Sequence, residues 1–261
     1  MLNRSSRLRV ALLCSRRAAG LDSLLADPAR GRAYDLVACL TTEDAFAQHA
    51  LLQAHGVPCL RQPIHPFYRW QRAPLSDLGL RRDFDAGSLR LLEPHAPDLL
   101  VLASYLYVLT GPVLEAFPAR IVNVHHSDLS RRGRGYPGLR AVRDAILAGE
   151  EETRATAHVV TDQLDAGPLL LRSWPFPVAS LARQALAWGA LDVVKTYASA
   201  HEEWMLRTAF GPLLAGAIAL YAEGRVQVRD GAALVDGRPG PLDLELPPAA
   251  GPRAALEAMA S

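Results

Sequence analysis

Two short apolar runs that end in polar side chains constrain most strongly how this chain can fold. They cover residues 121–126 and 156–167. Each is typical of a short buried strand, and a helix is predicted between them over residues 138–149. In an open α/β sheet, ligands bind just outside the carboxyl ends of the strands. We therefore expect polar groups from both runs to meet at one cleft.

Three side chains in these runs are candidate catalytic groups. Alternation along a strand places Asn123 and His125 on one side and His126 on the other. Asp165 lies in the loop after the second run, within reach of the imidazole. Taken singly, each is better explained as structural: a turn former, a partly buried histidine and an Asx-type turn residue. Their combination and order favour catalysis, whereas His158, inside the second strand, is expected in the core or behind the site.

The chain before these runs alternates apolar strands with helices, which is typical of βαβ units and a parallel sheet. Residues 41–44 are expected to cap a helix that ends near His55. Residues 61–78, with three prolines and an aromatic cluster, favour an irregular surface loop, with a lid or a subunit contact as the alternative. Strands are predicted at residues 8–14, 34–40, 57–60 and 98–103, and helices at residues 21–26, at residues 81–92 and from residue 110 onward.

The last third of the chain has a different pattern. Residues 180–221 are predicted to be helical, with breaks near Ala200 and at Gly211-Pro212. Residues 225–235 contain Asp230-Gly231 between two alternating runs, and this dipeptide is the strongest short hairpin signal in the chain. A helical segment followed by a terminal hairpin is therefore expected.

Length and composition predict one folded domain. A chain of 261 residues, half of them apolar, is long enough for a single large core. We predict an α/β domain over residues 1–240, with an open, mostly parallel twisted sheet, helices on both faces and a C-terminal β-hairpin. Residues 241–261, rich in proline, glycine and alanine, are expected to form a loose tail.

The charge balance and the cysteines narrow the function classes. Lys and Arg number 28 and Asp and Glu 27, so the net charge is +1, which favours neither nucleic acid nor a membrane surface as a partner. No run approaches the roughly 20 apolar residues of a membrane span, and no signal peptide is evident, so a cytoplasmic protein is expected. Cys14, Cys39 and Cys59 lack metal-ligand spacing and are expected to be free thiols, and no metal site is predicted.

The ordered motifs at Asn123-x-His125 and over residues 162–168 resemble those of the folate-dependent formyltransferases, most closely the phosphoribosylglycinamide formyltransferase branch. That family carries Asn-x-His at the end of a strand and, downstream, an Asp in an acidic-x-Leu-Asp-x-Gly-Pro loop. Residues 156–160 are similar to its Thr-x-His-x-Val strand, and residues 103–109 to its folate-facing loop. The likeness covers two stretches, residues 8–60 and 80–240.

The resemblance implies a formyl transfer, with 10-formyltetrahydrofolate as co-substrate and a small-molecule amine as acceptor. Asn123 and His125 would stabilise a tetrahedral intermediate and move a proton, and Asp165 would orient the imidazole. The oligomeric state is left open, a homodimer included. The folate contacts so implied are Leu106, Tyr107, Val108, Leu109, Val160, Thr161 and Asp162. The acceptor contacts are Ser15, Arg16, Arg17 and His126.

Departures from the family pattern lie mostly where the acceptor would bind. After the first strand the family holds a substrate phosphate with a loop of glycine, serine and asparagine, whereas residues 15–20 here are Ser-Arg-Arg-Ala-Ala-Gly. Arg16 and Arg17 are either a solvated turn or an anion clamp. The loop at residues 131–135 is longer and more basic, and Tyr107 stands where the family often has a basic residue. We hypothesise an acceptor other than glycinamide ribonucleotide that carries an anionic group.

Two other function classes stay open. A hydrolase, in which water replaces the amine and formate is released, would use the same three residues. The other alternative is a folate- or nucleotide-binding module without turnover. The first strand-to-helix loop lacks the Gly-x-Gly-x-x-Gly pattern of dinucleotide modules, and the presence of Asn123, His125 and Asp165 together argues against an inactive binder.

Overall fold

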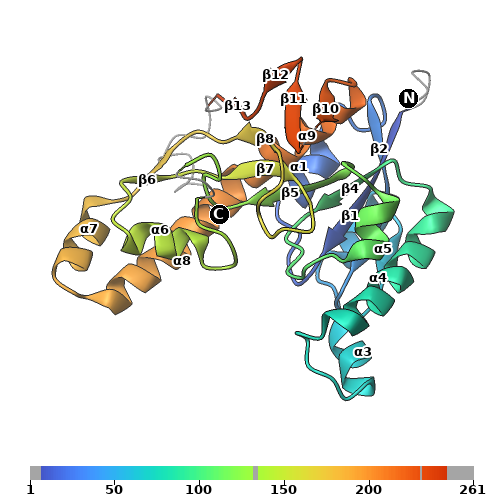
Figure 1. Ribbon diagram of the computed structural model, residues 1–261, viewed down its shortest axis with the longest axis horizontal. Helices are drawn as coiled ribbons and strands as arrows, with labels where there is room; N and C mark the ends of the chain where they lie inside the picture. Colours follow the sequence, from blue (N-terminus) through green and yellow to red (C-terminus); the bar gives the residue numbers. More distant parts are fainter. Residues whose placement is uncertain (1–6, 132–134, 230, 246–261) are drawn as a thin grey trace.

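The computed structural model describes residues 7–131, 135–229 and 231–245, and within them an eight-stranded mixed sheet forms the centre of the molecule (Figure 1). Its strands are β1 (Leu8–Cys14), β2 (Tyr34–Thr41), β3 (Cys59–Arg61), β4 (Leu99–Leu102), β5 (Ile121–His125), β7 (Thr156–Val159), β8 (Leu169–Arg172) and β13 (Leu242–Asp243). From edge to edge their order is β13-β8-β7-β5-β4-β1-β2-β3, and β1 to β5 pair in parallel. The predicted open, mostly parallel sheet is confirmed.

Helices cover both faces of this sheet (Figure 1). In the described part of the chain they are α1 (Leu21–Ala26), α2 (His49–Ala54), α3 (Ile64–Trp70), α4 (Leu78–Leu92), the short 3-10 helix η1 (Glu93–His95), α5 (Gly111–Ala116), α6 (Ala141–Leu147), α7 (Ser180–Ala187), α8 (Leu191–Thr208) and α9 (Phe210–Ala222). α1 and α9 pack on one face, and α4 and α5 on the other. α6, α7 and α8 pack together beside the sheet.

β1 shows why the sheet needs helices on both faces. Val10, Leu12 and Cys14 belong to the core shared with α1 and α9, whereas Ala11 and Leu13 belong to the core shared with α4 and α5. All five are 0% exposed. A near-continuous apolar strand of this kind is stable only when both of its faces are covered.

β7 runs antiparallel to β5, which corrects the expectation that both polar runs end at the same edge of a parallel sheet. The register pairs Asn123 with His158 and His125 with Thr156. The carboxyl end of β7 therefore lies beside the start of β5, and the loop after β7 has to turn back. Gly167 permits this return, because a Cβ at that position would lie only 1.7 Å from the carbonyl oxygen of Val159.

Two small sheets complete the fold among the described residues. β10 (Val226–Arg229), β11 (Ala232–Val235) and β12 (Arg238–Pro239) form an antiparallel sheet, and β6 (Glu152–Thr153) pairs with β9 (Phe176–Pro177). The predicted hairpin is confirmed, although Asp230 lies outside the described residues. β13 pairs in parallel with β8, so the predicted loose tail begins as part of the main sheet. The rest of that tail, residues 246–261, lies outside the described residues.

Two local predictions in the first half of the chain were wrong. Residues 41–44 do not cap a helix: α2 begins at His49, and Thr42 donates its hydroxyl to Ser15 Oγ inside the core. The expected loop at 61–78 contains α3, whose Tyr68 packs on Phe84 of α4, while Trp70 is 87% exposed. Aromatic packing at helical spacing explains why this proline-containing segment is ordered.

The helical segment after residue 180 breaks at other positions than expected. Ala200 lies inside α8, and the real breaks fall at residues 188–190 and at Ala209. Pro212 lies in the first turn of α9, where a missing backbone N–H leaves no hydrogen bond unmade. No described helix is by itself long and apolar enough to span a membrane. α8 and α9 meet that test only as a pair, with a bend of 41° between them.

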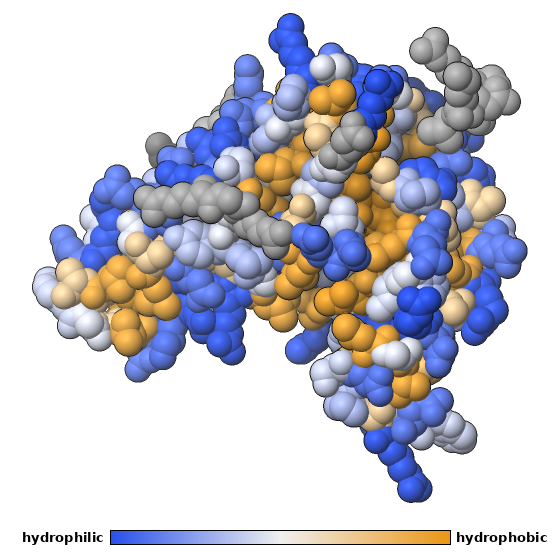
Figure 2. Space-filling view, viewed as in Figure 1, coloured by the Kyte–Doolittle hydropathy of each residue, from blue (hydrophilic) through white to orange (hydrophobic). Residues whose placement is uncertain are grey.

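Apolar surface gathers over α7 and the start of α8, at the left of Figure 2. Trp188 and Leu191 at the turn between the two helices are exposed, as is Leu181 on α7. Ala182 and Ala185 form the buried side of α7. The helix is therefore held by these small residues and by the partly buried Leu186, while Leu181 faces solvent.

A buried histidine joins α8 to β6. His201 is 3% exposed, with Nε2 2.7 Å from Thr153 Oγ1 and Nδ1 3.1 Å from the hydroxyl of Tyr197. Because the Thr153 hydroxyl donates to Met205 Sδ, His201 donates from Nε2 and accepts at Nδ1. Burial lowers the pKa of His201 to about 4. The folded state therefore needs this ring neutral.

We expect stability to fall as the pH drops from about 6.5 to about 4, because the unfolded chain binds a proton at His201 that the folded chain excludes. Above about pH 6.5 the neutral His201 makes its full contribution to the free energy of unfolding, which is about 3 kcal/mol relative to low pH. Urea unfolding of the wild type and of His201→Gln between these pH values measures it. The variant should show a shallower fall in the free energy of unfolding, and parallel curves would contradict the assignment.

Candidate functional site

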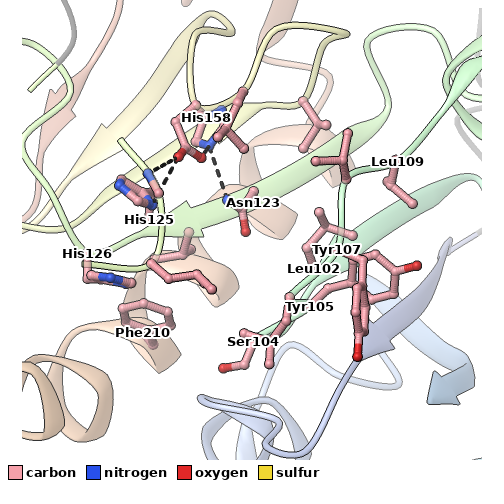
Figure 3. A pocket seen from close by; sticks show the side chains of 18 of the residues that line it. Leu102, Ser104, Tyr105, Tyr107, Leu109, Asn123, His125, His126, His158 and Phe210 are labelled. Carbon is pink, nitrogen blue, oxygen red and sulfur yellow. Dashed lines mark hydrogen bonds and ion pairs between the residues drawn. The ribbon is translucent and has the colours of Figure 1, made fainter. Parts of the chain in front are cut away.

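A cavity of about 770 Å³ lies at the carboxyl ends of the parallel strands. The loops after β1, β4 and β7, the end of β5 and one face of α8 line it. In Figure 3, Tyr107 and Leu109 lie at one side, His126 and Phe210 at the other, and Asn123 between them. The predicted cleft is thus present, with polar groups in the middle of an elongated space.

Asn123 and His158 face each other across the β5–β7 pair (Figure 3). Nδ1 of His158 lies 3.1 Å from the carbonyl oxygen of Val159, so Nδ1 carries the proton and donates it. Nε2 then offers a lone pair, which takes one N–H from Asn123 Nδ2 at 3.2 Å. Burial lowers the pKa of His158 to about 4 and keeps it neutral. This contact fixes the amide and leaves its second N–H for the cavity.

Asp165 lies where the loop after β7 returns to β5. Its backbone has φ 50°, a left-handed conformation that aspartate tolerates better than most residues. The carboxylate is 8% exposed and accepts the backbone N–H of Gly138 at 2.8 Å. It lies 3.7 Å from His125 Nδ1 and 3.8 Å from His158 Nε2. One carboxylate therefore faces both imidazoles.

His125 is held between two acceptors. Its Nε2 donates to the carbonyl oxygen of Tyr136 at 2.8 Å, while Nδ1 faces the carboxylate of Asp165. The residue is 5% exposed. The ring is therefore oriented by its hydrogen bond to the carbonyl, with the other nitrogen turned toward the carboxylate. Asn123, His125 and Asp165 come together as predicted, with His158 as a fourth member of the group.

His126 lies beside His125 and not on the opposite side, which corrects the alternation argument. β5 ends at His125, so the period of two no longer applies to the next residue. The two rings are 4.9 Å apart, and both line the cavity. His126 Nε2 has no hydrogen-bond partner among the described residues and lies 3.7 Å from a carboxylate oxygen of Glu202 on α8.

The other side of the cavity is apolar and open. Leu106, Val108 and Leu164 line it although they are between 43% and 58% exposed. Large apolar side chains gathered around a concave space are typical of a ligand pocket. The residues predicted to contact folate all line this cavity: Leu106, Tyr107, Val108, Leu109, Val160, Thr161 and Asp162.

Comparison with known proteins decides the family. A profile described as formyl transferase matches residues 8–179. The chain belongs to the formyl transferase family. This confirms the resemblance drawn from the Asn-x-His and Leu-Asp-x-Gly-Pro motifs.

This family member is similar to relatives that are named for two different activities. Phosphoribosylglycinamide formyltransferase of Escherichia coli is 30% identical over 158 residues, which cover 60% of this chain and 65% of that enzyme. Formyltetrahydrofolate deformylase of E. coli is 36% identical over 92 residues, 35% of this chain and 31% of that enzyme. The match thus spans less than two thirds of either relative. Glycinamide ribonucleotide transformylase 1 of Symbiobacterium toebii has a crystal structure with a TM-score of 0.64 and 25% identity, covering 88% of this chain and 94% of that one.

The loop after β1 differs in this family member as the sequence indicated. Ser15 is fully buried and does not line the cavity: its hydroxyl accepts the backbone N–H of Leu106 at 3.2 Å. Arg16 and Arg17 both line the cavity, but Arg17 forms an ion pair with Glu203 of α8. Of the predicted anion clamp, Arg16 remains without an ion pair among the described residues.

Two further departures from the family pattern are the basic loop at 131–135 and Tyr107. Of the basic loop at 131–135, residues 132–134 lie outside the described residues, and Arg131 pairs with Glu150 at 2.7 Å. Tyr107 lines the apolar side of the cavity, with the centre of its ring 4.9 Å from the guanidinium carbon of Arg81. No group of three or more potential metal ligands was found among the described residues.

Sequence reasoning missed the residues that hold the loop after β4. Arg81 of α4 is 2% exposed and donates to the carbonyl oxygen of Val108 at 3.5 Å. Asp85, one turn later, accepts the backbone N–H and the hydroxyl of Thr110, each at 2.6 Å. Burial raises the pKa of Asp85. The sequence does contain a signal for this arrangement. Arg81 and Asp85 are spaced along the helix so that they share a face with the apolar Phe84, and this face of α4 is buried.

We expect His158 to stay neutral, with its proton on Nδ1, well below neutral pH, because burial lowers its pKa to about 4. The Asp165→Asn substitution should lower that pKa further, since the carboxylate favours the charged ring. Nitrogen-15 NMR of labelled histidine rings measures both the tautomer and the titration. A His158 imidazolium at about pH 6, near the ordinary histidine pKa, would contradict the arrangement with Asn123.

Proposed function

We propose that this protein transfers the formyl group of 10-formyltetrahydrofolate to the amine of a small-molecule acceptor. The observation that carries the proposal is the meeting of Asn123, His125 and Asp165 in the middle of a cavity with an apolar side and a charged side. Family membership and relatives named for formyl transfer and for formyltetrahydrofolate support the reaction class.

The donor is proposed to lie along the apolar side. The pterin would lie against the backbone of the loop after β4 and against the loop after β7, where backbone N–H and C=O groups match its edge. Leu106 and Val108 would cover its faces, gaining roughly 25 cal/mol for each Å² of apolar surface removed from water. This placement puts the N10-formyl carbon near Asn123, at the boundary between the two sides.

The chemical steps follow from the hydrogen-bonding capacity of the group. The acceptor nitrogen attacks the formyl carbon, and the carbonyl electron pair moves to oxygen. The free N–H of Asn123 stabilises that oxygen, and His125, when it carries a proton on both nitrogens, adds a positive charge beside it. The attacking nitrogen then loses a proton and N10 gains one as the C–N10 bond breaks. Asp165 is the proposed relay, because both ring nitrogens of His125 already face acceptors.

The acceptor is proposed to differ from glycinamide ribonucleotide. In the loop after β1, the backbone N–H groups of Ser15 and Ala19 already donate to Ser104, at 3.2 and 3.3 Å. Gly20, with φ 82°, is the glycine that allows the turn into α1. Two of the six N–H groups of residues 15–20 are therefore already used, and a single glycine stands in this loop, which supports an acceptor bound more by side chains than by a backbone nest.

A hydrolase is the second candidate, because deformylases are among the relatives. Water would then take the place of the amine, and the same three residues would act. The assay that separates the two functions measures formate release from 10-formyltetrahydrofolate with and without added amines. Turnover that requires an amine supports transfer, and full turnover without one supports hydrolysis.

The Asp165→Asn substitution should lower kcat by on the order of 100-fold or more, because the amide cannot accept the proton. The fold should survive, since asparagine also tolerates φ 50° and can accept the N–H of Gly138. Tetrahydrofolate formation measures the rate, and thermal unfolding measures the fold. Asp83→Asn on the exposed side of α4 is the matched control, and near-normal turnover by Asp165→Asn would show that the carboxylate is not the relay.

The Val108→Asp substitution should raise the KM for 10-formyltetrahydrofolate about tenfold and leave kcat nearly unchanged, because a charge would be desolvated against the ligand. Leu181→Asp, at another exposed apolar position outside the cavity, is the control. Steady-state kinetics with varied folate measures the effect. An unchanged KM would place the folate elsewhere in the cavity.

A further inference from the structure

The charged side of the cavity is built by α8. Ser199, Glu202, Glu203 and Leu206 line the cavity at a helical spacing of three and four residues, so one face of the helix is presented to it. This face lies opposite the loop after β1. The acceptor proposed above would therefore meet two adjacent carboxylates.

The two carboxylates are not equivalent. Glu203 accepts from Arg17 and from Arg207, which lies 2.8 Å away, and these contacts lower its pKa. Glu202 makes no hydrogen bond with any described residue, and it lies 3.7 Å from His126 Nε2 and near the charges of Arg17 and Glu203. Burial raises the pKa of Glu202, which marks a carboxylate that its surroundings do not fully compensate.

His126 supplies a second hydrogen-bond acceptor, one without a hydrogen-bond partner among the described residues. Burial and the neighbouring His125 lower its pKa to about 3, so the ring is neutral. Its hydrogen bond with the Leu139 backbone favours the protonated ring and therefore uses a ring N–H. Because Nε2 has no partner, that N–H is at Nδ1, and Nε2 presents a lone pair beside Glu202.

A lone pair and a carboxylate 3.7 Å apart cannot satisfy each other, because both are acceptors. A group with two or more N–H donors on one nitrogen satisfies both at once. An alkylammonium is such a group, and it also adds a hydrogen-bonded positive charge to a half-buried carboxylate that has Arg17 near it but no hydrogen bond with a described residue. Arg16 lines the same cavity without an ion pair among the described residues, so it offers a site for an anionic group on the same acceptor.

We propose that Glu202 and His126 bind the reacting amine of the acceptor, that Glu202 removes the proton from its ammonium form, and that the acceptor is a small zwitterionic primary amine such as an aminoalkyl carboxylate or phosphonate. This rests on the proposed formyl transfer. The ammonium gives one proton to Glu202, and the neutral amine attacks the formyl carbon. The second proton leaves the attacking nitrogen for N10 through Asp165, and Glu202 then releases its proton to solvent.

The test compares acceptors that differ in charge at neutral pH. Glycine, L-ornithine and 2-aminoethylphosphonate are zwitterionic ammonium compounds, ethanolamine is an ammonium without an anion, and methoxyamine is a neutral amine. In the wild type, the zwitterions should have the highest kcat/KM with 10-formyltetrahydrofolate. Glu202→Gln should lose roughly 100-fold in kcat/KM with the ammonium acceptors and change by less than about threefold with methoxyamine, which needs no deprotonation.

The controls separate this proposal from the proposed function. Asp192→Asn removes a carboxylate from the same helix at a side chain that is 97% exposed, and it should leave every rate unchanged. Binding of a reduced folate analogue, measured by calorimetry, reports whether the variant keeps its fold and donor site. If Glu202→Gln does not fold, His126→Phe provides the second variant and should raise the KM for the ammonium acceptors more than the KM for methoxyamine.

Two results would overturn the proposal. Equal losses by Glu202→Gln with methoxyamine and with the ammonium acceptors would show that Glu202 does not take the proton. Equal wild-type rates with ethanolamine and with the zwitterions would show that the acceptor needs no anionic group. A wild-type protein that releases formate but formylates no amine would overturn the proposed transfer itself, and that outcome is visible before any variant is made.

Discussion

The antiparallel pairing of β5 and β7 is the constraint on which the site depends. It places His158 directly opposite Asn123, so that the neutral imidazole accepts one N–H of the amide and aims the other at the cavity. The same pairing directs the chain after β7 away from the site. Gly167 and the left-handed Asp165 then bring the loop back, and the carboxylate reaches both histidines.

Burial decides the charge of each group in the cavity. His158 and His126 lie in surroundings that disfavour a second proton, and both have lowered pKa values. His125 differs because its two nitrogens face a carbonyl and a carboxylate. A positive charge on that ring would stabilise an oxyanion beside Asn123 more strongly than it would in water, because a buried site has a lower dielectric constant.

Much of the architecture could be predicted from local sequence. The apolar runs of β1, β4 and β5 and the Asp230-Gly231 hairpin carry strong periodic or turn signals. The direction of β7 could not be predicted, because an apolar run of four residues has the same pattern in parallel and antiparallel sheets. α3 was missed for a similar reason, since its prolines favour a loop until Tyr68 finds Phe84 to pack against.

The sequence by itself determined the family and the identity of the candidate catalytic residues, because Asn123, His125 and Asp165 lie in ordered motifs that need no long-range contact to be recognised. Tertiary structure alone decided which charges remain available at the acceptor end. Arg17 and Glu203 are far apart in sequence, yet α8 brings them together and neutralises both, while Glu202 beside them keeps an unsatisfied carboxylate. Ion pairing depends on distance in space, and no local pattern reports that distance.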